Sequence, residues 1–208
     1  MSDDSMGAKL WDEHPGERLR DVIMLPRTRD DAEVAMFYDE AANRLADSFR
    51  GQPFDDTMLI PWLNHRRHAL ELSLKGLIRY ACRLRRKAGH VDTAHPLDLE
   101  MLNKRLRHEI SHNLTALVIE LDAHLTALDL DPLDPEIRQH IEAVAEVDEK
   151  GMSFRYASQL PTAPQRSDGG HPQIRLNFPS LRQEFATQYN TLTGLFTVLE
   201  LQEDAFDF

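Results

Sequence analysis

Apolar residues recur every three or four positions along most of the chain, the spacing that places them on one face of an α-helix. This pattern predicts helices over about residues 30–49, 61–89 and 99–128. The third is the most regular, because its leucine-rich stripe continues from Leu99 to Leu128 without a gap. An unbroken helix of that length is about 45 Å long, at about 1.5 Å per residue.

Two further helices are predicted in the C-terminal part of the chain. Asp134 and Pro135 predict the start of the fourth, because Asp is a favoured N-cap and Pro fits the first helical position, and Gly151 predicts its end. Ser180 and Gln183 have the spacing of a capping box and predict the start of the fifth. Five amphipathic helices indicate an all-α fold, a helical bundle.

The remaining segments are polar or contain turn-forming residues. Residues 1–29 are acidic and aperiodic and predict an N-terminal tail or flap, which leaves residues 30–208 as a single helical domain. Residues 157–173 contain three prolines and a Gly-Gly pair and predict a loop. Residues 153–156 and 173–178 alternate weakly, so a small β-hairpin or an irregular loop is expected before the last helix.

Composition and charge narrow the function classes. With 24 Lys and Arg against 35 Asp and Glu, the net charge is −11, so any contact with nucleic acid must be local. Cys82 is the only cysteine, which excludes an internal disulfide and fits a reducing compartment. No apolar run reaches the length of a membrane span, and the first residues do not resemble a signal peptide. We therefore expect a cytoplasmic protein without membrane contact.

Five basic residues lie within nine positions at the end of the second predicted helix: Arg79, Arg83, Arg85, Arg86 and Lys87. No acidic residue lies among them. One interpretation is a solvated face whose cations complement the C-terminal end of the helix dipole. The other is a patch that contacts the phosphates of RNA.

His108, Glu109 and His112 form the pattern HExxH. On a helix this spacing places two imidazoles one turn apart, with a glutamate as general base for a zinc-bound water. Both histidines face away from the leucine stripe, and the sequence offers no clear third ligand, so we expect no metal. A zinc hydrolase is the third alternative for the function.

Arg107 and His112 support another interpretation of the same segment. An arginine holds a phosphate oxygen and a histidine moves a proton near neutral pH, so the pair suits cleavage of RNA through its 2′-hydroxyl. The Arg-x(4–6)-His spacing occurs five times in the chain, against about three expected by chance. On one straight helix the two side chains point about 140° apart, so they converge only through a kink or across a subunit interface.

Several other polar residues have a structural interpretation. His68, Glu71 and Lys75 belong to a polar ladder on the second helix, and Glu71 and Lys75 have the favourable i,i+4 orientation of an ion pair. His95 is expected in the loop before the third helix, and Cys82 is expected in the core.

Three short motifs resemble those of the HEPN superfamily of helical-bundle proteins. They are the run Arg67–Lys75, RHALELSLK, the turn that starts with His95, HPL, and the run EVDEKGMSFRY, which ends in Arg155 and Tyr156. In the superfamily, a glutamate and a lysine four residues apart precede a His-x-Leu turn, and an Arg-Tyr pair follows a later helix. The order is the same here over about residues 35–200.

The resemblance implies an α-helical bundle, frequently a homodimer, found in bacterial toxin, phage-defence and RNA-processing systems. Its catalytic members are metal-independent ribonucleases whose Arg-x(4–6)-His motif meets its copy at the dimer interface. Arg107 and His112 match that motif best, with His108 in the polar position after the arginine. The commonest pattern has asparagine after the arginine and an aromatic residue close behind the histidine, where this chain has His108, Asn113 and Leu114.

These observations lead to one main hypothesis and one alternative. The main hypothesis is a metal-independent, cofactor-free endoribonuclease of a prokaryotic defence or toxin–antitoxin system, in which Arg107 holds the scissile phosphate, His112 moves the proton and His108 assists. A homodimer is expected, with RNA or a nucleotide as ligand and a partner protein of the same system. The alternative is a non-catalytic HEPN module that binds and regulates a nucleotide or a protein partner.

Overall fold

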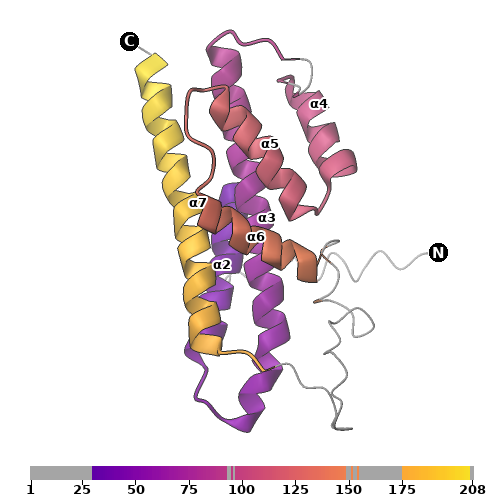
Figure 1. Cartoon of the computed structure of the whole chain (residues 1–208), viewed down its shortest axis with the longest axis vertical. Coiled ribbons are helices and arrows are strands. Elements are labelled where there is room, and N and C mark those ends of the chain that lie inside the picture. The colour runs from indigo at the N-terminus through magenta and orange to yellow at the C-terminus, as the bar shows by residue number, and fades with distance from the viewer. Residues whose placement is uncertain are drawn as a thin grey trace, which may run out of the picture.

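The structure is a computed structural model that describes residues 30–92, 95, 97–148, 151, 154 and 175–206. Six α-helices and no strand occur in these residues (Figure 1), which confirms the all-α helical bundle. The predicted tail over residues 1–29 and loop over residues 157–173 lie outside the described residues, as does most of the predicted hairpin. The described residues 175–177 are not a strand, and a helix begins at residue 178.

α2 (Asp31–Asp47) and α3 (Asp56–Lys87) form an antiparallel pair. α2 begins where the sequence predicted a helix, and the Asp30 side chain caps it by accepting a hydrogen bond from a backbone N–H of the first turn at 2.9 Å. The sequence predicts the start of this helix at Pro61, but α3 begins five residues earlier, at Asp56. A short 3₁₀ turn, Pro53–Asp55, leads into α3, and Pro53 occupies the first position of that turn.

The third predicted helix is broken, so the prediction of a continuous helix was wrong. α4 (Leu99–Lys104) runs directly into a π-helical segment, η3 (Arg105–Ile110), and α5 (Leu114–Thr126) is a separate helix. Ser111 lies between them with φ 55° and ψ −111°, and the Asn113 side chain caps α5. The leucine stripe continues across the break because both arms bury leucines in the same core, from Leu102 to Leu128, whereas Leu99 is exposed.

α6 (Pro135–Val147) and α7 (Phe178–Phe206) complete the bundle. Asp134 caps α6, as predicted. α7 begins two residues before the predicted Ser180, and the Asn177 side chain accepts the hydrogen bond of Ser180 N at 3.2 Å. α7 lies along α3, and α6 crosses between α5 and α7 (Figure 1).

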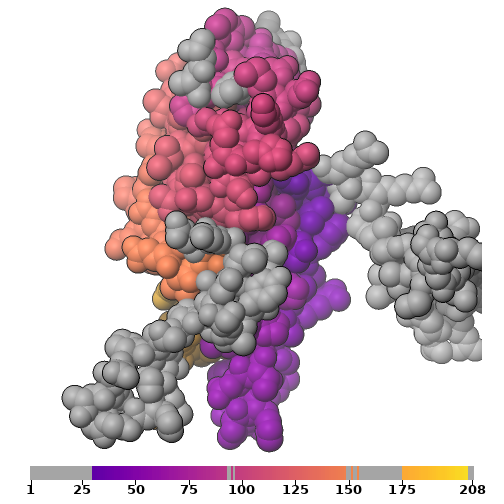
Figure 2. All heavy atoms as spheres, turned by 90° about the vertical axis from the view of Figure 1, so that its right-hand side faces the viewer, coloured from indigo at the N-terminus to yellow at the C-terminus, as the bar shows by residue number. Residues whose placement is uncertain are grey.

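α3 is the central element and packs against α2, α5 and α7. Trp62 of α3 is fully buried, and its ring lies edge-on to Phe178 and Phe185 of α7, with centroids 5.0 and 5.2 Å apart. On the face shown in Figure 2, α4, η3 and α5 form most of the upper half, and the start of α3 forms the lower end. Because α3 packs against three other helices, the charged residues that it buries are held in place by the core of the bundle.

Candidate active site

Three charged residues occupy one face of α3 at four-residue spacing: Arg67, Glu71 and Lys75. The Glu71 side chain is only 2% exposed. Its Oε2 accepts a hydrogen bond from Arg67 Nη1 at 2.8 Å, and its Oε1 accepts one from Lys75 Nζ at 2.7 Å. Burial raises the pKa of Glu71, but Lys75, Arg67 and His112 together outweigh burial and lower the pKa to about 2. Glu71 is therefore ionised at neutral pH, and we call it and its partners the Glu71 centre.

Arg67 connects the Glu71 centre to two distant parts of the chain. Its Nη2 donates a hydrogen bond to the backbone carbonyl of His112 at 2.6 Å, and its Nε forms an ion pair with Asp148 Oδ2 at 2.9 Å. Gly151 has φ 68°, and a Cβ at that position would lie 3.1 Å from the Arg67 guanidinium carbon. Two of the motifs that resemble the HEPN superfamily therefore contact each other at Arg67.

His112 is 46% exposed, although its Nδ1 lies 2.9 Å from Oε1 of the buried Glu71. An ionised carboxylate only accepts hydrogen bonds, so Nδ1 carries the hydrogen and Nε2 is the acceptor of the neutral imidazole. No described residue is hydrogen-bonded to Nε2. A buried carboxylate thus orients a half-exposed imidazole whose basic nitrogen is available to a ligand, the arrangement of a general base.

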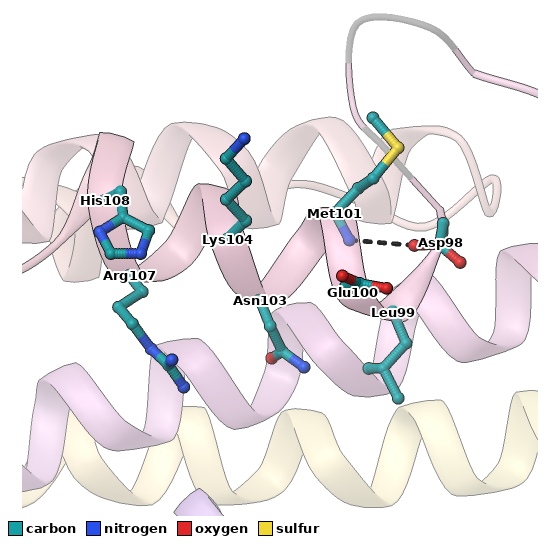
Figure 3. A pocket seen from close by; sticks show the side chains of 8 residues that line it. All are labelled: Asp98, Leu99, Glu100, Met101, Asn103, Lys104, Arg107 and His108. Carbon is teal, nitrogen blue, oxygen red and sulfur yellow. Dashed lines mark hydrogen bonds between the residues drawn. The ribbon is translucent and has the colours of Figure 1, made fainter.

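Arg107 lies on the segment that runs antiparallel to the second half of α3. Asn103 Oδ1 accepts a hydrogen bond from Arg79 Nε at 3.0 Å, and further along the segment His112 meets Glu71. Arg107 is between these contacts in the sequence and extends from the same side of the segment as Asn103 (Figure 3). Its side chain is exposed and has no hydrogen bond or ion pair with a described residue. Arg107 is therefore available to bind an anion.

His108 is exposed on the same segment and has no polar partner among the described residues. With Arg107 it lines a groove of about 790 Å³ along α4 (Figure 3), together with Asp98, Leu99, Glu100, Met101, Asn103 and Lys104. No hydrogen bond joins Arg107, His108 or His112 to one another within the chain. The three residues of the predicted motif thus share one exposed segment without direct contact.

The HExxH pattern does not lie on one α-helix. His108 belongs to η3 and His112 follows the break at Ser111, so the regular helical spacing of two zinc ligands is not formed. Glu109 pairs with Arg105 at 3.1 Å, away from the Glu71 centre. Among the residues that the structure describes, no group of three His, Cys, Asp or Glu side chains is placed to hold a metal ion. The geometry that the zinc alternative requires is not formed there.

Arg85 does not belong to the predicted RNA-binding surface. Its side chain is buried, with Nη1 2.9 Å from His124 Nδ1 and Nη2 donating to Asp92 Oδ2 at 2.6 Å. The reason is the helical period: Arg79, Arg83 and Arg86 are three or four residues apart and share a face, whereas Arg85 points to the core.

The other four basic residues of the cluster are partly or fully exposed. Arg79 pairs with Asp31 of α2, and Arg83 and Lys87 approach Glu203 of α7 at 2.9 and 3.9 Å. Arg86 is exposed and has no polar partner among the described residues. The surface is therefore basic on α3, but acidic residues from both neighbouring helices partly neutralise it.

A second buried glutamate, Glu120, has a similar set of partners, which we call the Glu120 centre. Glu120 Oε2 lies 3.1 Å from His95 Nδ1 and accepts a hydrogen bond from Arg105 Nη2 at 2.8 Å, and its Oε1 is 3.6 Å from His124 Nε2. Burial raises the pKa of Glu120, but His124, Arg105 and His95 lower it to about 2. The sequence interpretation missed Glu120 and Arg105, and the only local signal is the four-residue spacing of Glu120 and His124.

Of the remaining predicted residues, His68 and Cys82 pack against neighbouring groups, and Arg155 and Tyr156 are not among the described residues. The His68 ring lies against the Tyr38 ring, with centroids 4.4 Å apart. Cys82 is buried, with its Sγ 3.3 Å from the carbonyl oxygen of Leu97. Arg155 and Tyr156 lie outside the described residues.

No family model matches this chain, and neither a curated protein nor a solved structure does. The HEPN resemblance therefore stays a prediction that depends on the three motifs. None of the described helices is both long enough and apolar enough to cross a membrane.

Proposed function

We propose that the protein is a metal-independent endoribonuclease in which His112 moves the proton and Arg107 binds the scissile phosphate. The observation that carries the proposal is the hydrogen bond of 2.9 Å between His112 Nδ1 and the buried, ionised Glu71, with the imidazole 46% exposed. This contact fixes the tautomer and the direction of the ring, as a general base requires.

The reaction follows from the available groups. His112 Nε2 removes the proton of a ribose 2′-hydroxyl, and the 2′-oxygen attacks the adjacent phosphorus. The bond from phosphorus to the 5′-oxygen breaks, which leaves a 2′,3′-cyclic phosphate on one fragment. The departing 5′-oxygen takes a proton from water or from His108. The Arg107 guanidinium stabilises the charge that develops on the non-bridging oxygens.

A second copy of the chain completes the site in this proposal. Arg107 and His112 form no hydrogen bond with each other in one chain, so the arginine of one copy and the histidine of the other are expected to meet across a homodimer interface. Cytoplasmic location and a role in a prokaryotic defence or toxin–antitoxin system rest on the sequence interpretation and the HEPN resemblance.

The second candidate is a binding module that holds RNA or a nucleotide without cleaving it. The observation that favours it is that the buried groups of the Glu71 centre satisfy one another. Glu71 is bonded by Arg67, Lys75 and His112, which suffices to explain them as a structural network.

Cleavage of a single-stranded RNA by the purified full chain in excess EDTA tests the proposal. We expect wild type to cleave, and His112→Ala and Arg107→Ala to lose at least about 100-fold in rate. His90→Gln is the matched control, because His90 is an exposed histidine outside the site. A substrate with 2′-deoxyribose at the cleaved position is expected to stay intact. RNA binding without cleavage by wild type would favour the binding module.

A further inference from the structure

A hollow of about 650 Å³ opens between the start of α2, the second half of α3 and α7. Leu99 lines both this hollow and the groove beside α4, and Arg79 of the hollow is hydrogen-bonded to Asn103 of the groove. The two depressions are therefore adjacent along α3. Glu71 and Arg86 are 15 residues apart on α3, so the surface from the Glu71 centre to the far side of the hollow is about 22 Å long.

Aromatic rings, three arginines and two acidic residues, Asp30 and Glu200, line the hollow. Tyr80, Tyr189 and Phe196 contribute the rings, and the Arg83 guanidinium carbon lies 4.2 Å from the centroid of the Tyr80 ring. The Phe196 ring packs against Gly76, where a Cβ would lie only 3.1 Å from it. A planar group that enters the hollow meets rings and a guanidinium plane, and its attached anion meets the arginine side chains.

Two of the three arginines of the hollow pair with acidic side chains of the neighbouring helices, Arg79 with Asp31 and Arg83 with Glu203. Glu203 accepts hydrogen bonds from Tyr80 Oη at 2.7 Å and from Arg83 Nη2 at 2.9 Å. Arg83 is 52% exposed, so this ion pair contributes little stability, and a phosphate is able to replace the carboxylate. Arg86 has no polar partner among the described residues of the chain.

We propose that the hollow binds an unpaired base and the adjoining phosphates of single-stranded RNA, which continues along α3 to His112. This inference rests on the proposed ribonuclease function and adds a surface, away from the Glu71 centre, that holds the substrate. A duplex keeps its bases stacked inside and has none to place among the rings, whereas single strands bind proteins by such stacking. A duplex presents the phosphates of two strands, and the net charge of −11 on the protein repels this higher density of negative charge more strongly.

Fluorescence anisotropy with the full-length wild-type protein tests the substrate class. The probe is a labelled single-stranded RNA with 2′-O-methyl groups throughout, which the proposed reaction cannot cleave, and it is compared with its duplex. We expect the single strand to bind at least about tenfold more tightly, and abasic positions in it to weaken binding. Equal affinity for the duplex, or no effect of abasic positions, would overturn the proposal.

Variants test the residues of the hollow. Glu203→Gln is expected to tighten binding a few-fold, because it frees Arg83, and this gain cannot arise from partial unfolding. Arg86→Ala is expected to weaken binding and to reduce the salt dependence by about one phosphate contact. Arg44→Ala, an exposed arginine of α2 paired with Glu40, is the control and should bind as wild type. Unchanged binding by both Glu203→Gln and Arg86→Ala would overturn the assignment.

The outcomes separate this inference from the ribonuclease proposal. Cleavage that depends on His112 but not on Arg86 or Glu203 would overturn the hollow alone. Single-strand binding that depends on these residues, without cleavage by wild type, would overturn the ribonuclease alone. Displacement of the RNA by polyglutamate at the same concentration of charges would overturn the RNA assignment in favour of an acidic protein partner.

Discussion

The Glu71 centre and the Glu120 centre share three kinds of chemical group but differ in the exposure of their histidines. Each has a buried glutamate whose pKa is lowered to about 2, an arginine, and a histidine whose Nδ1 faces the carboxylate. His112 of the first centre is 46% exposed, whereas in the second His95 is 25% exposed and His124 is fully buried. A histidine–carboxylate pair alone therefore does not identify an active site, and its accessibility separates a candidate catalytic pair from an internal anchor.

The two centres also hold the two ends of one segment, residues 105–112. The Glu120 centre bonds Arg105 of η3 to α5, and the Glu71 centre bonds His112, just after the break, to α3. Arg107 and His108 lie between these attachments. The segment that carries the candidate motif is thus fixed on both sides by buried carboxylates, which positions the two exposed residues.

The largest expected effect is the loss of stability when each buried glutamate is removed, which should be greater where the arginine left behind is more buried. Glu71→Ala leaves Arg67, which is 2% exposed, without one of its two carboxylates, and we expect it to lower the free energy of unfolding by about 3–5 kcal/mol. Glu120→Ala leaves Arg105, which is 26% exposed and keeps Glu109, so a loss of about 1–3 kcal/mol is expected. Urea unfolding measures both. Equal losses would contradict the role assigned to burial.

Acid is expected to weaken both centres. Their glutamates have a pKa of about 2 in the fold and an ordinary value of 4.5, so the stability they contribute is complete above about pH 4.5 and is lost as the pH falls towards 2. At about 1.4 kcal/mol per pKa unit, a shift of this size corresponds to a few kcal/mol of stability at neutral pH.

Glu71→Gln tests this pH dependence. The variant should be less stable than wild type at pH 7 and should lose less stability between pH 5 and pH 3, because one of the carboxylates whose pKa is lowered by folding is gone. Urea unfolding at the three pH values measures the difference. A variant that keeps the full pH dependence of wild type would show that Glu71 is not the group responsible.

Gly151→Ala tests how tightly the Glu71 centre is packed. The new Cβ lies 3.1 Å from the Arg67 guanidinium carbon, and φ is 68°, so both crowding and backbone strain destabilise the variant, by about 2–3 kcal/mol in total. Gly89→Ala is the matched control, since φ is 77° there and no atom lies within 4 Å of the added Cβ. Thermal unfolding should show the larger loss for Gly151→Ala. The same loss for both would mean that Arg67 moves aside freely.

The smallest expected effect is at the break before His112. Ser111 has φ 55° and ψ −111°, which glycine adopts more readily, so Ser111→Gly should raise the free energy of unfolding by about 0.5–1 kcal/mol. Asp129→Gly is the control, because Asp129 also has a positive φ, of 57°, but aspartate tolerates the left-handed region better. Destabilisation by Ser111→Gly would show that the Ser111 side chain supports the break.

The sequence predicts the helices well because their signals are local. The predicted cap at Asp134 and the predicted helix start near residue 30 both agree with the structure. The break at Ser111 leaves no such mark in the apolar pattern, since the leucines on both sides enter the same core. The break is stabilised from outside the segment, by the hydrogen bond from Arg67 to the backbone of His112, 45 residues away.

Arg107, His108 and His112 were predicted as candidate catalytic residues, whereas Glu71 was interpreted as structural and its contact with His112 was not predicted. Glu71 and Lys75 are four residues apart on one helix, so their pairing follows from the sequence. The contact of Glu71 with His112 joins positions 41 residues apart, and that of Arg105 with Glu120 spans 15 residues and the break. Such contacts depend on how the helices pack, which periodicity alone does not specify.

The central claim is that His112 of the Glu71 centre, and not His95 of the Glu120 centre, moves the proton in RNA cleavage. Wild type, His112→Gln and His95→Gln are compared in excess EDTA, at a temperature where circular dichroism shows all three folded. The account predicts at least about a 100-fold loss of cleavage for His112→Gln and a rate within a few-fold of wild type for His95→Gln. Cleavage by His112→Gln at the wild-type rate would contradict it.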